Sequence, residues 1–164
     1  MVINEIINRR SVREFSDQPV SDEDIIDVIK AGQFAPNSRG NFAEEFIVIR
    51  EPQLREKLFD LTGDALLQKA PVLIIPVTNT EKTSEALQDL SVVTENMFIQ
   101  ATSLGLGTVW KNISPAIMER IRPVIELPAN FVFINIIPLG YPADKPKPHS
   151  DTDFSAQKIH SEKW

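Results

Sequence analysis

The sequence predicts a three-layer α+β sandwich in which helices flank a central mixed β-sheet. Short apolar runs typical of buried strands alternate with segments whose apolar residues recur every three or four positions, as on helices. These elements do not repeat as regular strand–helix–strand units, and no Gly-x-Gly-x-x-Gly follows a strand, which argues against a Rossmann fold. The 164 residues, 42% of them hydrophobic, suit a single domain over residues 1–164.

The first half of the chain predicts three helices and one strand. Isoleucines at helical spacing indicate a short helix over residues 2–8. Ser21 is suited to cap a second helix, which ends at Gly32. Residues 46–49 are apolar like a short buried strand, and Pro52 stands where a third helix begins.

The second half predicts two strong strands and a long helix between them. Residues 72–77 form a continuous apolar run, as in a strand covered on both faces, and Pro76 indicates an end or an irregularity. Residues 84–104 predict a helix that is apolar around much of its girth, which places it at the centre of a domain or of a dimer. Another helix begins at Ser114-Pro115, and residues 131–139 form the last strong strand.

Composition excludes several classes of function. The formal net charge of −6 and the pI near 5.0 argue against nucleic acid as a main partner. The absence of cysteine excludes disulfides, thiolate zinc sites, cysteine nucleophiles and iron–sulfur clusters. Because the two histidines, His149 and His160, both lie late in the chain, we expect no metal site. Neither a signal-peptide pattern nor an apolar run long enough to cross a bilayer is visible, so we expect a cytoplasmic protein without a membrane partner.

Three arginines and a serine crowd the N-terminal segment of this acidic chain. Arg9, Arg10 and Arg13 surround Ser11 within five positions. Guanidinium groups present planar forks of donors that match phosphate or carboxylate, and the serine adds a hydroxyl, so this run predicts an anchor for one anionic group. The alternative is a solvated basic turn that complements the end of the preceding helix.

Four segments together resemble the signatures of the nitroreductase family of FMN-dependent oxidoreductases, in its short form. They are Arg9-Arg10-Ser11-x-Arg13-x-Phe15, Ala35-Pro36-Asn37-Ser38, the helix with Asp89, Asn96-Met97 and Ala101 that runs into residues 104–110, and Pro138-Leu139-Gly140-Tyr141-Pro142. The resemblance covers essentially the whole chain in order. It implies a nitroreductase-like sandwich and a homodimer in which two FMN molecules lie at the interface, each in contact with both chains.

The resemblance also implies roles for particular residues. Arg9 and Ser11 hold the phosphate and ribityl end of FMN, with Arg10 in the same shell, and Arg13 reaches the pyrimidine edge. A guanidinium there would stabilise the negative charge that hydride transfer builds around N1 and O2 of the ring. The partner chain shapes the edge of the ring with three consecutive residues, Pro36, Asn37 and Ser38.

Later residues complete the implied cofactor site. The backbone N–H groups of Lys111 and Asn112 face flavin N5 and O4, and the asparagine, which replaces the usual glycine, tolerates left-handed geometry. Lys147 and His149 supply late basic contacts to the phosphate. The alternatives are that Lys111 is an exposed loop lysine and that residues 146–148 form a stiff, solvated arm.

The chain departs from the family after Ser38. The family commonly reads Asn-x-Gln-Pro-Trp there, and its glutamine bonds to the flavin, whereas here Phe42 or a shifted Asn41 takes the place of the glutamine. We therefore expect the site to hold FMN more loosely, or to be more acidic, than is usual in the family.

The implied function is transfer of hydride from NAD(P)H through flavin N5 to a small planar acceptor of the nitroaromatic or quinone type, by a ping-pong mechanism. We assign no catalytic acid, base or nucleophile, because flavin carries the redox chemistry. Two alternatives remain. One is flavin chemistry of the dehalogenase or flavin-degrading type, which needs a lid that the short segment 79–88 does not supply. The other is a non-enzymatic flavin-binding dimer.

Overall fold

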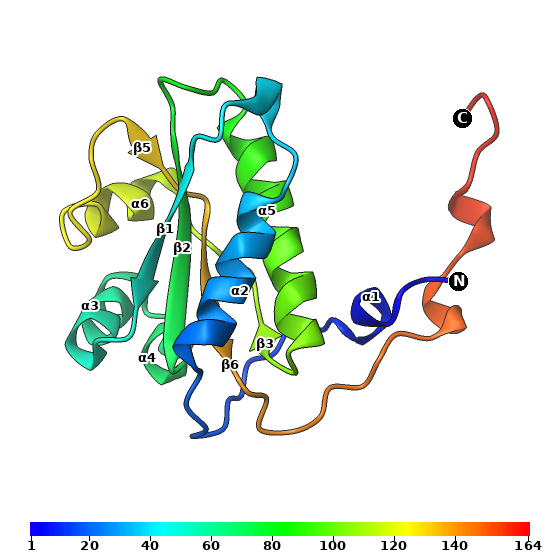
Figure 1. Ribbon diagram of the computed structural model, residues 1–164, viewed down its shortest axis with the longest axis horizontal. Coiled ribbons are helices and arrows are strands. Elements are labelled where there is room, and N and C mark those ends of the chain that lie inside the picture. Colours follow the sequence, from blue (N-terminus) through cyan, green and yellow to red (C-terminus); the bar gives the residue numbers. More distant parts are fainter.

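A six-stranded sheet forms the centre of the molecule, and helices lie on both of its faces. The computed structural model describes residues 1–164, and Figure 1 shows the strands upright between two groups of helices. The order across the sheet is β1-β2-β6-β3, while β4 also pairs with β6 and β5 with β2. The strands are β1 (Glu44–Ile49), β2 (Val72–Asn79), β3 (Gly107–Thr108), β4 (Lys111–Asn112), β5 (Phe131–Val132) and β6 (Asn135–Gly140).

Every pair of strands is antiparallel, and the one parallel contact is an isolated bridge between Ser11 and Thr108. The mixed sheet that the sequence predicts is therefore mixed only at this bridge. Topology explains the difference. β2 and β3 run the same way, but β6 inserts between them and is antiparallel to both.

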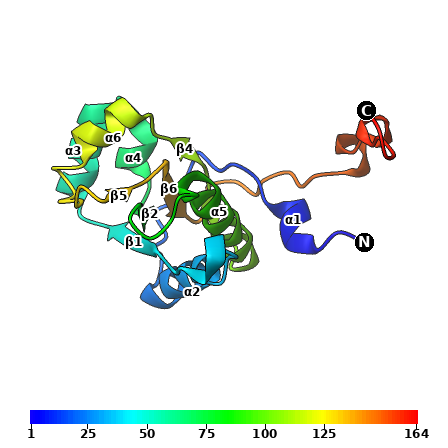
Figure 2. The same cartoon turned by 90° about the horizontal axis from the view of Figure 1, so that it is seen from above.

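Helices form the two outer layers, as the sequence predicts (Figure 2). The helices α2 (Asp22–Gln33) and α5 (Ala86–Ser103) cover one face of the sheet, and α3 (Pro52–Thr62), α4 (Ala65–Lys69) and α6 (Pro115–Ile121) cover the other. Each face has its own buried cluster, with Ile74 in one and Ile75 in the other. Because successive side chains of β2 enter opposite clusters, every residue of this strand is buried, and its sequence is almost continuously apolar.

Local sequence determines where several helices begin and end. The hydroxyl of Ser21 accepts a hydrogen bond from Asp24 N–H at 3.0 Å and caps α2, as expected. Ser114 caps α6 in the same way. Gly63 ends α3 with a φ of 70°, a conformation that glycine adopts without steric cost.

Two prolines interrupt the pairing of the sheet. Pro76 lies between the part of β2 that pairs with β6 and the part that pairs with β5, which is why the predicted strand over residues 131–139 divides into two. Pro138 lies opposite the gap between β3 and β4. Ile113 N–H bonds to Ile134 O at 2.9 Å, so every second residue from Ile134 along β6 faces the side of β3 and β4. Pro138 is one of these residues, and it has no N–H to donate to that side.

The two ends of the chain leave the body together as an arm, made of α1 (Asn4–Asn8) and residues 143–164 (Figures 1 and 2). The arm contains the short 3-10 turns η2 (Asp151–Asp153) and η3 (Ala156–Lys158). The N-terminal and C-terminal parts of the arm are joined where His149 N–H donates to Ile7 O at 2.8 Å. Large apolar side chains are exposed on the arm and at the residue before α1, namely Ile3, Ile6, Phe154, Ile159 and Trp164. None of the helices combines the length and the apolar character that a membrane-spanning segment requires.

Candidate functional site

The N-terminal segment lies along the sheet beside β3. Ser11 forms the parallel bridge to Thr108, and Val12 N–H donates to Thr108 O at 2.9 Å. A Cβ on Gly107 would lie 2.5 Å from Cγ2 of Val12, so this close approach requires glycine. The alternative of a solvated basic turn is not what the structure has: Arg9 is the half-buried C-cap residue of α1, the last turn of this helix holds no basic residue, and the chain after it is extended beside β3.

Extended backbone places alternate residues of this segment on opposite sides. Arg9, Ser11 and Arg13 therefore share one side, where Ser11 and Arg13 are exposed and Arg9 is half-buried. Arg9 forms a long ion pair of 3.5 Å with Glu95 of α5, and Arg13 has no ion pair at all. We call this set of three residues the arginine face. Its cationic donors are available to an anion.

Arg10 lies on the other side of the segment, where it lines a cavity of about 480 Å³ near the end of α5. Its Nη1 lies 3.2 Å from Nδ1 of His149, so the structure brings these two predicted residues together, away from the arginine face. Lys147 is exposed and forms no hydrogen bond or ion pair. The predicted phosphate shell is thus divided between two sides of one segment.

His149 also faces an acid. The Nδ1 atom that meets Arg10 lies 3.0 Å from Oδ2 of Asp153. One nitrogen cannot accept from a guanidinium and donate to a carboxylate at once, so the protonation of Nδ1 selects the partner. A hydrogen bond from Ser150 N–H, followed by the one with His149, holds the pKa of Asp153 below its ordinary value.

Lys111 and Asn112 form β4, and their backbone N–H groups point to opposite sides of this strand. Since Ile113 N–H points into the ladder with β6, two-residue alternation directs Lys111 N–H into it and Asn112 N–H away from it. Of the two backbone N–H groups expected to face the flavin, only that of Asn112 is not used in the pairing of the sheet. Asn112 does not have a positive φ, so the expected left-handed geometry is not used. The Lys111 side chain forms an ion pair with Asp64 and is no free loop lysine.

The predicted ring-edge segment lies in the loop before β1, around the turn η1 (Ser38–Gly40). Pro36 at its start is exposed, and Asn37 Oδ1 is buried without a hydrogen-bond partner. Ser38 N–H donates to Oδ1 of Asp89 at 2.8 Å. We assign no role to Asp89 from the sequence. An acidic residue among the apolar positions of a helix is the signal that could have indicated one.

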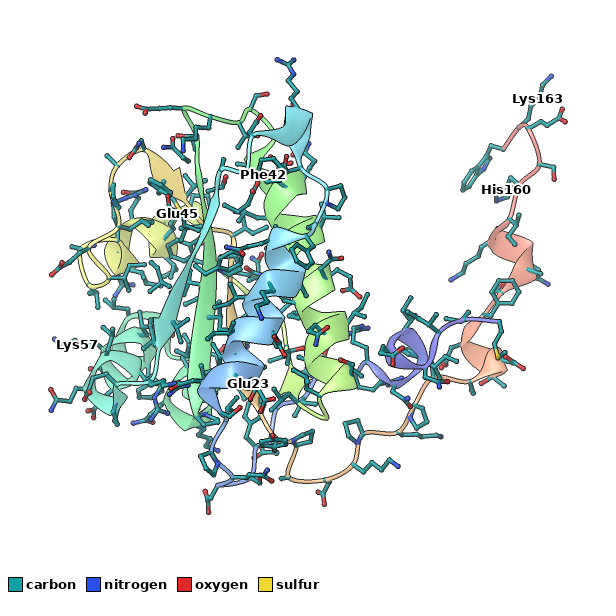
Figure 3. The ribbon with its side chains drawn as sticks, in the orientation of Figure 1. Glu23, Phe42, Glu45, Lys57, His160 and Lys163 are labelled. Atoms are coloured by element: carbon teal, nitrogen blue, oxygen red, sulfur yellow. The ribbon has the colours of Figure 1, made fainter.

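The sequence offers Phe42 or a shifted Asn41 in place of the family's glutamine, and the structure places these two residues differently. The Asn41 side chain donates to Lys82 O at 2.8 Å, so its amide is engaged within the protein. Phe42 is 73% exposed and has a φ of 49°, which is rare for a bulky residue. Figure 3 shows Phe42 close to the N-terminal end of α5. An exposed aromatic ring thus projects from this loop, and the amide of the neighbouring Asn41 is engaged within the chain.

Two serines of the candidate site lie near opposite ends of α5. Ser38 bonds to Asp89 in the first turn of this helix, whereas Ser11 bridges to Thr108, beyond its last residue, Ser103 (Figure 1). At 1.5 Å per residue, the helix between Asp89 and Ser103 alone is about 21 Å long. Arg9 lies between these ends, since it meets Glu95 near the middle of the helix, about 9 Å along it from Asp89.

Comparison with known proteins identifies the family. The model of the Nitroreductase family matches residues 6–71 and 60–141. A protein of Archaeoglobus fulgidus named "Putative NADH dehydrogenase/NAD(P)H nitroreductase" is 34% identical, over 97% of this chain and 96% of its own. A crystal structure of a protein with the same name from Parabacteroides distasonis is 33% identical, with a TM-score of 0.90 over 98% of this chain and 96% of that one.

A third similar protein is the FMN-dependent nitroreductase of Clostridium difficile. It is 27% identical, and its structure has a TM-score of 0.92 over 99% of this chain and 100% of that one. The family match includes all four segments that carry the resemblance, apart from the last residue of the fourth. By sequence and by fold, the chain belongs to the nitroreductase family.

Proposed function

We propose that the chain is an FMN-dependent NAD(P)H oxidoreductase that reduces a small planar acceptor of the nitroaromatic or quinone type. One observation carries the proposal: the arginine face lies beside the edge of β3 and β4, where Asn112 N–H is not used by the sheet. The relatives support it, since two are named NAD(P)H nitroreductases and one is named FMN-dependent.

The donors and acceptors on the chain fit FMN. Guanidinium and hydroxyl donors match phosphate oxygens, Asn112 N–H can donate to a ring acceptor, and the unpartnered Asn37 Oδ1 requires a donor. When bound, FMN supplies hydride acceptance from NAD(P)H at N5 and reduction of the acceptor in a second half-reaction. Arg9 and Ser11 would hold its phosphate, and Arg13 would stabilise negative charge at the pyrimidine edge.

The proposed enzyme is a homodimer with two shared sites. Ser11 and Ser38 lie near opposite ends of α5 in one chain, but a two-fold axis that pairs α5 with its copy in the opposite direction would bring the arginine face of one chain next to the ring-edge segment of the other. Leu87 and Val92 are exposed on α5, and the arm adds further uncovered apolar side chains. Both features support a partner that covers this side of the molecule.

An open site would admit a range of acceptors. The connection between β2 and α5 holds no aromatic residue, and Asn41 anchors it at Lys82 O, so no flap of chain is available as a lid. Specificity would then come mainly from stacking, with few hydrogen bonds to reject analogues. Initial-rate plots at several acceptor concentrations should give parallel lines, as a ping-pong route requires, whereas intersecting lines would contradict it.

The first experiment is flavin titration of Arg9→Ala beside Arg120→Ala. Arg9→Ala removes a charge-assisted contact of about 1.5–3 kcal/mol, so the Kd for FMN should rise roughly tenfold or more. Arg120, exposed on α6, is the matched control and should leave this Kd unchanged. Equal FMN affinity in both variants would remove Arg9 from the site.

The second experiment separates catalysis from mere binding. The protein loaded with FMN is mixed with NADH or NADPH under anaerobic conditions, and the visible flavin absorbance is followed. Loss of the absorbance, with recovery after a quinone is added, is the expected result. A yellow protein that neither nicotinamide bleaches would indicate the non-enzymatic flavin-binding dimer instead.

A further inference from the structure

Asp89 is a buried acid whose two carboxylate oxygens are both engaged. It lies in the first turn of α5 with only 3% of its surface exposed. Its Oδ1 accepts from Ser38 N–H at 2.8 Å, and its Oδ2 accepts from the hydroxyl of Thr83 at 2.7 Å. One side chain therefore joins the ring-edge segment to the connection between β2 and α5.

Further hydrogen bonds tie the same two loops together. The Thr83 hydroxyl also accepts from Glu85 N–H at 3.0 Å, which fixes it for donation to Asp89. Asn41 reaches Lys82 O, and Asn79 N–H donates to Ala43 O at 3.2 Å. With Asp89 at its centre, this network holds the loop before β1 against the start of α5.

No cation balances the charge of Asp89. It takes part in no ion pair, so only two hydrogen bonds and the positive end of α5 stabilise the carboxylate. Burying a charge without a counter-ion is unfavourable compared with burying an apolar side chain of similar size. Packing therefore does not explain a polar side chain here, and its two hydrogen bonds show which backbone it fixes.

We propose that Asp89 is a positioning residue that holds Pro36-Asn37-Ser38 in the conformation that contacts the flavin ring bound by the partner chain. This inference rests on the proposed function. It follows from the direct bond to Ser38 N–H, which sets the backbone of the segment one residue from the unpartnered Asn37 Oδ1. Asp89 acts on the ring edge, whereas the arginine face acts on the phosphate.

The two roles are separated by titrating riboflavin as well as FMN, because riboflavin has the ring but no phosphate. Asp89→Ala should raise the Kd of both flavins by the same factor, about tenfold or more. Arg9→Ala should raise the Kd of FMN and leave that of riboflavin nearly unchanged. The visible circular dichroism of bound flavin should also change in Asp89→Ala, since the surroundings of the ring differ.

Conservative variants keep the test valid if Asp89→Ala does not fold. In Asp89→Asn the amide oxygen can still accept from Ser38 N–H while its NH₂ donates to the Thr83 hydroxyl, so both Kd values should stay within about threefold of wild type. Thr83→Val removes the hydroxyl's bonds to Asp89 and from Glu85 N–H but leaves the bond from Ser38 N–H to Asp89, so it should weaken both flavins equally, by less than Asp89→Ala. An Asp89→Asn variant as weak as Asp89→Ala would overturn the positional role.

A general loss of stability is excluded with Ile121→Val, a buried change on α6 in the opposite layer. This variant should lower the Tm without altering either Kd. If it weakens flavin as Asp89→Ala does at an equal fall in Tm, or if Asp89→Ala leaves riboflavin affinity unchanged, the inference is wrong. If wild type binds neither flavin, the proposed function itself fails, which is a distinct result.

Discussion

Replacing Gly107 by alanine should detach the N-terminal segment from the sheet. The added Cβ would lie 2.5 Å from Cγ2, 2.6 Å from Cβ and 2.8 Å from Cγ1 of Val12. Valine is stiff at χ1, and two of its three atoms would remain in the way after any rotation. The segment must therefore move outward by about 1 Å to restore an ordinary carbon–carbon contact of about 3.5–4.0 Å. That shift stretches the bond from Val12 N–H to Thr108 O.

Overpacking of this kind costs about 1–3 kcal/mol. For a chain of this length, each kcal/mol lowers the Tm by about 2–4 °C, so Gly107→Ala should unfold about 2–12 °C below wild type. Because Ser11 and Arg13 flank Val12, the Kd for FMN should rise together with this loss of stability. Thermal unfolding followed by circular dichroism, and FMN titration, measure the two effects.

Gly63→Ala is the matched control. Gly63 has a φ of 70° and nothing within 4 Å of its absent Cβ, so alanine there adds backbone strain of about 1–2 kcal/mol without a clash. Its Tm should fall while FMN affinity stays the same. A Gly107→Ala protein with wild-type Tm and wild-type FMN affinity would refute the inference that this glycine sets the position of the arginine face.

Three further outcomes are expected. Phe42→Gly should be more stable to urea than Phe42→Ala by about 1 kcal/mol, because glycine adopts a positive φ without strain, and equal stability would contradict the strained conformation. Since the folded pKa of Asp153 is lowered, its bonds contribute stability above the ordinary carboxyl pKa of about 3.9 and lose it as the pH falls through the lowered value. The protection of the Ser150 amide from hydrogen exchange, taken relative to the intrinsic exchange rate at each pH, should therefore fall in acid in wild type, and Asp153→Asn should abolish this fall. Phe154→Asp should shift the sedimentation of the chain from dimer toward the 18.5 kDa monomer at micromolar concentration, and an unchanged dimer would exclude this part of the arm from the interface.

Much of the fold follows from patterns within a few neighbouring residues. The serine caps at Ser21 and Ser114, the apolar run of β2 and the long helix over residues 84–104 are local features, and each element forms where the sequence predicts it. The four segments that resemble the family are also short and contiguous. Such signals need no knowledge of which distant residues meet, so sequence alone determines them.

The arrangement of the candidate site depends on contacts between distant parts of the chain. Ser38 and Asp89 are 51 residues apart, and nothing local pairs them. Likewise, Arg10 lies beside His149 because alternation of an extended segment directs it away from Arg9. A run of basic residues predicts an anionic ligand but does not say which side chains share a face.

The sequence by itself therefore determined the family, the layers of helix and strand, and the kind of ligand that suits the arginines, because local spacing and residue chemistry carry that information. Only the tertiary structure decided that Asn41 is engaged by Lys82 O, that the sheet leaves Asn112 N–H unused, and that Ser11 and Ser38 lie near opposite ends of α5. These features depend on strand register and on helix length measured across the fold, and neither is written in any one segment.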